Sequence, residues 1–329
     1  MIRKGVIYSV IFVIICLCLP VIITRIDKTV VNTNIVPTEA NKQEETYNYN
    51  SYNTIKLLHK STGEIEEVYL DEYLYGVVAA EMPASYEKEA LKAQAAVART
   101  YTIYNIKNIH KHENCDMCDD SSCCQAYITK QDRFEKWDEK ERETNWERIV
   151  GAVNSTAGKI ITYNGEPINA LFHANSGGET EISSNVWGGA DYPYLQTVAT
   201  SGEEGYKQYS SSVTITKEEV ADKLKQNHPD IIINYDDKPI EILEYTDSGR
   251  VKTIRFGNTQ ISGVEARSLF GLKSTKFNVT IGENVTFDVI GYGHGVGMSQ
   301  TGADSLAKES YSYEEIIKHF YPGVEIKNL

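Results

Sequence analysis

An uncharged apolar run near the start of the chain limits its fold more than any other feature of the sequence. The run extends from Val6 to Thr24 and follows Arg3 and Lys4. A helix of this length, at about 1.5 Å per residue, crosses the apolar core of a bilayer. Because basic flanks stay on the cytoplasmic side, the rest of the chain is expected outside the cell. Residues 1–28 are therefore predicted to be a cytoplasmic tip and a single-pass transmembrane anchor in the cell membrane.

A cleaved signal peptide is the alternative for this segment. The apolar run is longer than the hydrophobic region of most signal peptides and no small-residue cleavage site follows it, so an uncleaved anchor is favoured. Residues 29–53 are polar and lack apolar periodicity, which predicts a flexible linker. Residues 54–329 are then expected to form an extracytoplasmic ectodomain, with a smaller lobe near residues 205–285.

Residues 54–329 alternate short strand patterns with helical ones, which predicts an α+β fold of mixed helices and short antiparallel strands. Turn residues separate the strand patterns, and two capping boxes mark helix starts. The expected strands are 55–58, 66–70, 159–163, 168–174, 240–245, 251–256 and 287–290. The expected helices are 71–80, 85–108 and those that begin after Thr216 and Ser312.

The charge balance excludes one class of partner. The chain has 33 Lys and Arg against 46 Asp and Glu, a net charge of −13. A protein that binds nucleic acid must neutralise phosphates with basic side chains, so nucleic acid is not expected as a partner. Contact with any other anionic polymer must be made locally, because the net charge of the chain repels it.

The first predicted helix ends in a carboxylate. Leu74, Val77 and Val78 form its apolar stripe, and Glu81 continues that stripe by one step before Pro83 ends the helix. A carboxylate that faces apolar neighbours at a helix end is expected to be partly desolvated, which raises its pKa and suits a general acid. The alternative is that Glu81 turns outward into solvent.

Four segments of the sequence resemble the motifs of a known family. They are 73–84 (YLYGVVAAEMPA), 90–101 (ALKAQAAVARTY), 172–178 (FHANSGG) and 291–303 (GYGHGVGMSQTGA). In this order they are similar to the stage II sporulation protein D family. The resemblance implies a glycan-binding groove and a lytic transglycosylase that cleaves peptidoglycan during engulfment of the forespore. It also implies a place on the mother-cell membrane facing the septal wall, and it puts the catalytic glutamate at Glu81.

The reaction that the resemblance implies needs a single acid. Glu81 would protonate the oxygen between N-acetylmuramic acid and N-acetylglucosamine, and would then accept the proton of the muramic 6-hydroxyl as a 1,6-anhydro ring closes. Because the sugar supplies its own nucleophile, the chemistry requires no second carboxylate and no cofactor. The resemblance further implies a preference for glycan strands stripped of stem peptides, with stage II sporulation proteins P and M as partners.

Five more residues are candidates for substrate contact. Ser176 and Gly177 follow a strand pattern, and His294 lies in a glycine-rich stretch, where backbone can approach a ligand closely. Tyr163 offers a flat ring and a hydroxyl to a sugar, and the resemblance marks Arg99 as a site residue. The alternatives are tight turns without a ligand for the two loops and a structural ion pair for Arg99.

Residues 110–124 are dense in cysteine and histidine. A Cys-x-x-Cys pair followed by two adjacent cysteines is typical of a zinc site, and disulfides are the alternative in an extracytoplasmic protein. By position, the resemblance implies His112, Cys118, Cys123 and Cys124 as the ligands. Four protein ligands leave no place for an activated water, so a structural Zn²⁺ is expected.

Two other functions stay open on the sequence. A zinc-dependent peptidoglycan hydrolase would need an open coordination position at the metal. A non-catalytic scaffold that binds the wall at the membrane would generate no new chain ends and would be indifferent to Glu81→Gln.

Overall fold

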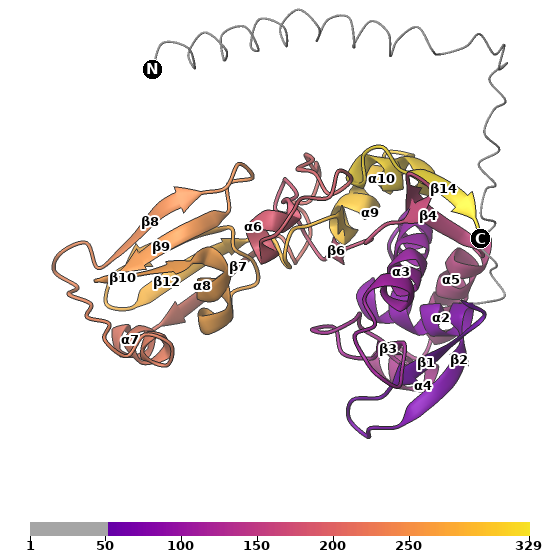
Figure 1. Cartoon of the computed structure of the whole chain (residues 1–329), viewed down its shortest axis with the longest axis horizontal. Helices are drawn as coiled ribbons and strands as arrows, with labels where there is room; N and C mark the ends of the chain where they lie inside the picture. Colours follow the sequence, from indigo (N-terminus) through magenta and orange to yellow (C-terminus); the bar gives the residue numbers. More distant parts are fainter. Residues whose placement is uncertain (1–51) are drawn as a thin grey trace, which may run out of the picture. The chain divides into compact units, whose positions relative to one another are not determined.

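Two hydrophobic cores organise residues 52–329, the part of the chain that the computed structural model describes (Figure 1). The first core is mostly helical, whereas the second consists of antiparallel strands and two helices. Both cores lie in one unit of the chain, Tyr47–Leu329. The mixed α+β composition predicted from the sequence is confirmed.

Helix α3 (Lys88–Asn108) is the centre of the first core. Its alanines are fully buried, and because alanine has no side chain beyond Cβ, neighbouring elements approach its axis closely. The elements packed on it are α2 (Leu70–Glu81), α5 (Arg142–Ser155), α9 (Gln300–Lys308), α10 (Tyr313–Phe320) and β4 (Lys159–Tyr163).

Two small sheets flank these helices. Strand β1 (Thr54–Leu58) pairs antiparallel with β2 (Ile65–Tyr69) and parallel with β3 (Met117–Cys118). Strand β4 pairs antiparallel with β5 (Glu166–Pro167) and β14 (Glu325–Asn328). The turn between β4 and β5 has positive φ at both central residues, as an Asn-Gly hairpin requires. Helix α4 (Lys130–Lys136) connects the first sheet to α5.

The second core lies between two three-stranded antiparallel sheets and helices α7 and α8. The strand orders are β10-β9-β8 and β11-β12-β7, and a cluster of phenylalanine rings that includes Phe270 and Phe287, with centroids 4.9 Å apart, fills the interior. The elements are β7 (Ser210–Ile215), α7 (Lys217–Lys225), β8 (Ile240–Tyr245), β9 (Val251–Phe256), β10 (Thr259–Ser262), α8 (Gly263–Phe270), β11 (Phe277–Ile281) and β12 (Val285–Ile290). Both predicted capping boxes are present, at Thr216 for α7 and Ser312 for α10.

A short parallel pair, β6 (Phe172–His173) and β13 (Met298–Ser299), brings two distant loops together. The loop before β13 lies directly against the β6 segment. This close approach requires glycine at two positions of the loop. A Cβ at Gly293 would lie 2.7 Å from the Cβ of His173, and one at Gly297 would lie 2.0 Å from the Leu171 carbonyl oxygen. Helix α6 (Ser183–Trp187) follows the β6 loop.

The prediction of a membrane-anchored fold is corrected by the structure. No helix formed by residues 52–329 is long and apolar enough to cross a bilayer, since even the 21-residue α3 carries several charged side chains. The predicted anchor, residues 1–28, and most of the predicted linker lie outside the described residues. The single-pass anchor and the cell-membrane location inferred from it thus stand corrected.

Candidate active site

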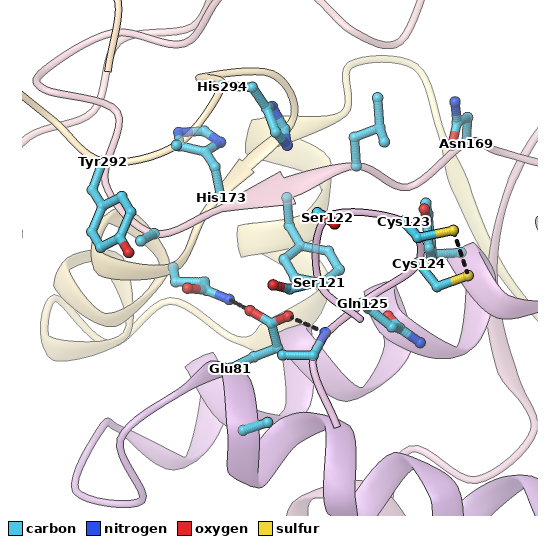
Figure 2. A pocket seen from close by; sticks show the side chains of 18 of the residues that line it. Glu81, Ser121, Ser122, Cys123, Cys124, Gln125, Asn169, His173, Tyr292 and His294 are labelled. Carbon is cyan, nitrogen blue, oxygen red and sulfur yellow. Dashed lines mark hydrogen bonds between the residues drawn. The ribbon is translucent and has the colours of Figure 1, made fainter. Parts of the chain in front are cut away.

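A pocket of about 740 Å³ opens between segments that are far apart in the sequence. Helix α2 contributes Glu81, and the cysteine-rich segment contributes Cys123 to Ala126. Strand β6 contributes His173, the loop before β13 contributes His294, and α9 begins with Gln300. Figure 2 labels Glu81, His173 and His294 around this cavity, with Cys123, Cys124 and Gln125 of the cysteine-rich segment. The second core supplies Arg267, on α8.

Glu81 is the last residue of α2, which ends there because Pro83 has no N–H to continue the helix. The Ala126 amide donates to Glu81 Oε1 at 2.9 Å, and the Gln300 side-chain amide donates to Oε2 at 3.1 Å (Figure 2). Burial raises the pKa of Glu81, and the two hydrogen bonds only partly offset that rise. The desolvated carboxyl with a raised pKa predicted from the helix pattern is therefore confirmed.

A different part of the pocket wall is aromatic. The His294 ring lies 5.0 Å from the Trp187 ring and 5.6 Å from the His173 ring, measured between centroids. Burial lowers the pKa of His173 to about 3, and it lowers the pKa of His294 well below its ordinary value, so both imidazoles are neutral. Trp187 is 56% exposed and Tyr292 is 42% exposed. This part of the wall therefore offers aromatic rings to a ligand, with the Arg267 side chain in the same lining and the Lys273 ammonium 4.8 Å from the centroid of the Tyr292 ring.

The other predicted substrate contacts lie outside the pocket lining. Arg99 is fully buried and binds Asp71 at 3.0 Å and the Thr156 carbonyl at 2.7 Å, the contacts of a structural ion pair. The Tyr163 ring packs on the Tyr194 ring. Of the five candidates for substrate contact, His294 is the one that lines the pocket.

Ser176 belongs to a buried polar network around Glu203, and the adjacent Gly177 amide donates to Asn175 Oδ1 at 2.9 Å. The carboxylate of Glu203, with no exposed surface, accepts hydrogen bonds from two backbone amides and four hydroxyls. The donors are the amides of Ser176 and Gly178 and the hydroxyls of Ser176, Thr200, Ser299 and Thr301. Burial would raise the pKa of Glu203, but these donors lower it. The network ties the β6 loop to the start of α9.

Sequence reasoning missed several of these residues. Gln300 lies inside a motif that the sequence comparison singled out, but nothing local indicates that it reaches Glu81. Glu203 follows a Ser-Gly pair in an unpatterned stretch, and Trp187 and Arg267 lie outside the four motifs. Only the packed chain brings these side chains to the site.

His112, Cys118, Cys123 and Cys124 form a compact cluster beside the pocket. Their ligand atoms all lie within 4.8 Å of one another, and none of the four cysteines in the described residues forms a disulfide. His112 Nε2 lies 3.7 Å from Cys123 Sγ and 3.5 Å from Cys124 Sγ, and the two sulfurs are 4.0 Å apart. A tetrahedral zinc ion needs roughly 3.6 Å between nitrogen and sulfur and roughly 3.8 Å between sulfurs. The donor set and its spacing therefore fit a zinc ion.

The sequence of the chain places it among known proteins. It is 34% identical to stage II sporulation protein D of Bacillus subtilis (strain 168) over 303 residues, which cover 91% of this chain and 85% of the relative. It is 33% identical to the protein of that name from Bacillus amyloliquefaciens, over 83% of this chain and 78% of the relative. The chain belongs to the stage II sporulation protein D family.

Two further findings accompany the assignment to the stage II sporulation protein D family. The family described as "Stage II sporulation protein" matches residues 58–163, which include Glu81 and the four residues of the His/Cys cluster. A Bacillus subtilis protein named "Amidase enhancer" is 30% identical over 77% of this chain and 40% of the relative. The family predicted from the four motifs is thereby confirmed.

Proposed function

We propose that this sporulation protein is a peptidoglycan lytic transglycosylase that uses Glu81 as its general acid and base. The observation that carries the proposal is the environment of the Glu81 carboxyl. It lines the pocket, burial raises its pKa, and two donors hold its orientation. Among the described residues that line the pocket, no other residue has a carboxylate. A glycosidase that hydrolyses its substrate needs two carboxyl groups, whereas a lytic enzyme needs one.

The proposed reaction passes one proton through Glu81. The protonated carboxyl donates to the oxygen that joins C1 of N-acetylmuramic acid to N-acetylglucosamine, and the C1–O bond breaks with the electron pair on that oxygen. The resulting carboxylate accepts the proton of the muramic 6-hydroxyl, whose oxygen bonds to C1 and closes the 1,6-anhydro ring. The amide of Ala126 and the side chain of Gln300 stabilise the carboxylate between the two steps.

The aromatic wall supports a sugar substrate. Trp187 and Tyr292 expose flat apolar faces into the region of the pocket. The neutral rings of His173 and His294 add polar edges without charge. Exposed aromatic rings of this kind can stack on the apolar faces of N-acetyl sugars.

The His/Cys cluster is proposed to hold a structural Zn²⁺. His112, Cys118, Cys123 and Cys124 would supply all four ligands, which leaves the ion without an open position. The bound ion would fix the segment that carries Ala126, whose amide donates to Glu81. This role differs from that of a catalytic zinc in a peptidoglycan hydrolase.

The biological setting is proposed from the family. Engulfment of the forespore requires removal of septal wall, and the preferred substrate is proposed to be glycan already stripped of stem peptides. Stage II sporulation protein P, which removes those peptides, and stage II sporulation protein M are the proposed partners. These assignments rest on the family membership.

Mass spectrometry of peptide-free glycan strands, incubated with the full chain, tests the proposed chemistry. The wild-type protein is expected to produce 1,6-anhydromuramic ends. Glu81→Gln is expected to reduce their formation by about 10³-fold or more, because it removes the transferable proton. Glu72→Gln, an exposed position on the same helix, is the matched control and should retain activity.

Each other outcome points to a different function. Ordinary reducing ends would mean hydrolysis and a second carboxyl group. Loss of activity on chelation from a protein that stays folded would favour the zinc hydrolase. Binding to glycan without any new ends, unchanged in Glu81→Gln, would favour a wall-binding scaffold.

A further inference from the structure

Arg267 is a half-buried cation in the wall of the candidate active site. It lies on α8, in the second core, and it lines the same pocket as Glu81. Its Nε donates to the Leu272 carbonyl at 3.3 Å. Within residues 52–329, no carboxylate forms an ion pair with its guanidinium. A desolvated cation that lacks an anionic partner is costly unless a ligand supplies one.

The charged residues around Arg267 also differ from those of the chain as a whole. The whole chain carries a net charge of −13. The Lys, Arg, Asp and Glu residues in the pocket lining are nevertheless two cations and Glu81, and burial raises the pKa of Glu81. The other cation, Lys111, donates to the Tyr101 hydroxyl and the Cys123 carbonyl, beside the His/Cys cluster. Arg267 instead lies near the neutral imidazoles of His173 and His294, and near Tyr292. The positive charge of this wall is therefore fixed and available to a ligand.

We infer that Arg267 binds a carboxylate on the sugar ring of the substrate and so selects muramic residues whose lactyl carboxyl is free. The inference rests on the proposed glycan substrate. In such a strand the lactyl group is the anionic substituent of the sugars, and a stem peptide attached through an amide removes its charge. The planar guanidinium of arginine matches a carboxylate with two parallel hydrogen bonds. Arg267 thus acts as a specificity-determining residue and takes no part in proton transfer.

Two matched glycans test this inference on the full chain. One is a peptide-free strand with free lactyl carboxyls, and the other is the same strand with those carboxyls converted to methyl amides. For the free-carboxyl strand, Arg267→Gln is expected to raise KM by about ten- to a hundredfold with little change in kcat. For the amidated strand, Arg267→Gln and wild type should have the same KM. Arg255→Gln, which removes a charge from β9 of the same core, is the control and should match wild type on both strands.

The result that overturns the inference is an equal effect of Arg267→Gln on both strands, or no effect on either. If Arg267→Gln does not fold, Arg267→Lys, which keeps the positive charge but lacks the planar fork, replaces it in the same comparison. A rise in KM confined to the free-carboxyl strand supports the inference, and an equal change on both strands, or none, overturns it. If wild type cuts neither strand, the proposed reaction fails, and calorimetric binding of both strands still tests Arg267 separately. A binding preference for the free carboxyl that disappears in Arg267→Gln supports it, and equal binding overturns it.

Discussion

Burial raises the pKa of the carboxyl groups of both Glu203 and Glu81, yet the net pKa shifts of the two groups have opposite signs. Glu203 accepts hydrogen bonds from two amides and four hydroxyls, and its pKa falls below the ordinary value. Glu81 accepts two hydrogen bonds, and burial keeps its pKa above the ordinary value. Because burial raises the pKa of both groups, the number of donors decides whether a carboxyl stays ionised.

The comparison assigns different roles to the two groups. Glu203 stays ionised and joins loops of the first core, so it is a structural anion. Glu81 lines a pocket and has a raised pKa, which suits a group that gives a proton to a substrate. A buried glutamate is therefore a candidate acid only where its donors are few.

The largest effect on stability is expected at Glu203. Glu203→Ala leaves several buried donors without an acceptor and should lower the free energy of unfolding by about 3–5 kcal/mol. Because the folded pKa of Glu203 is lowered, its stabilisation is present above pH 4.5, its ordinary pKa, and is lost as the pH falls through the folded value. Urea unfolding at several pH values measures both effects.

A neighbouring position provides the control for this prediction. Glu204 is exposed, and Glu204→Ala should change the free energy of unfolding by less than about 0.5 kcal/mol. A loss below about 1 kcal/mol in Glu203→Ala would contradict the structural role of the network.

Loss of zinc from the His/Cys cluster is expected to affect the surroundings of Glu81 but not those of Glu203. Cys124→Ser should abolish stoichiometric zinc, measured by elemental analysis, and should lower stability by about 3 kcal/mol if free zinc exceeds Kd about a hundredfold. Hydrogen exchange of the Ala126 amide should accelerate, because its segment follows the cluster directly, while exchange of the Gly178 amide at Glu203 should not change.

Cys115→Ser is the matched variant, because Cys115 lies outside the cluster. It should retain zinc and the wild-type exchange rates. Equal acceleration at Ala126 and Gly178 would show that the metal stabilises the whole core and not the Glu81 side alone.

The smallest of the expected effects is a shift in the pH profile of activity when Gln300, a hydrogen-bond donor to Glu81, is replaced. Gln300 stabilises the ionised form, so Gln300→Leu should raise the pKa of Glu81 further. A general acid works while protonated, and the basic limb of the kcat/KM profile should therefore move to higher pH. Gln208→Leu, another glutamine of the pocket lining, is the control. A limb that stays in place or moves to lower pH would show that Glu81 does not set it.

Local patterns predicted much of the fold and part of the site. The helix pattern placed Glu81 at the end of α2, and the spacing of residues 110–124 indicated the His/Cys cluster, because these features involve neighbouring residues. The resemblance marked Arg99 as a substrate contact and the glycine-flanked loop pattern marked Ser176, whereas the structure buries both. A polar residue in a motif can serve a ligand or the core, and the motif does not distinguish these roles.

The sequence by itself determined the family, the two capping boxes, the α2 boundary and the position of the buried acid. Tertiary structure alone decided which groups surround that acid. Gln300 lies 219 positions from Glu81, and Ala126 lies 45 positions away. Arg267 reaches the pocket from the second core. Helix and turn preferences act over a few residues, whereas a pKa and a pocket depend on groups that meet only when the chain has packed.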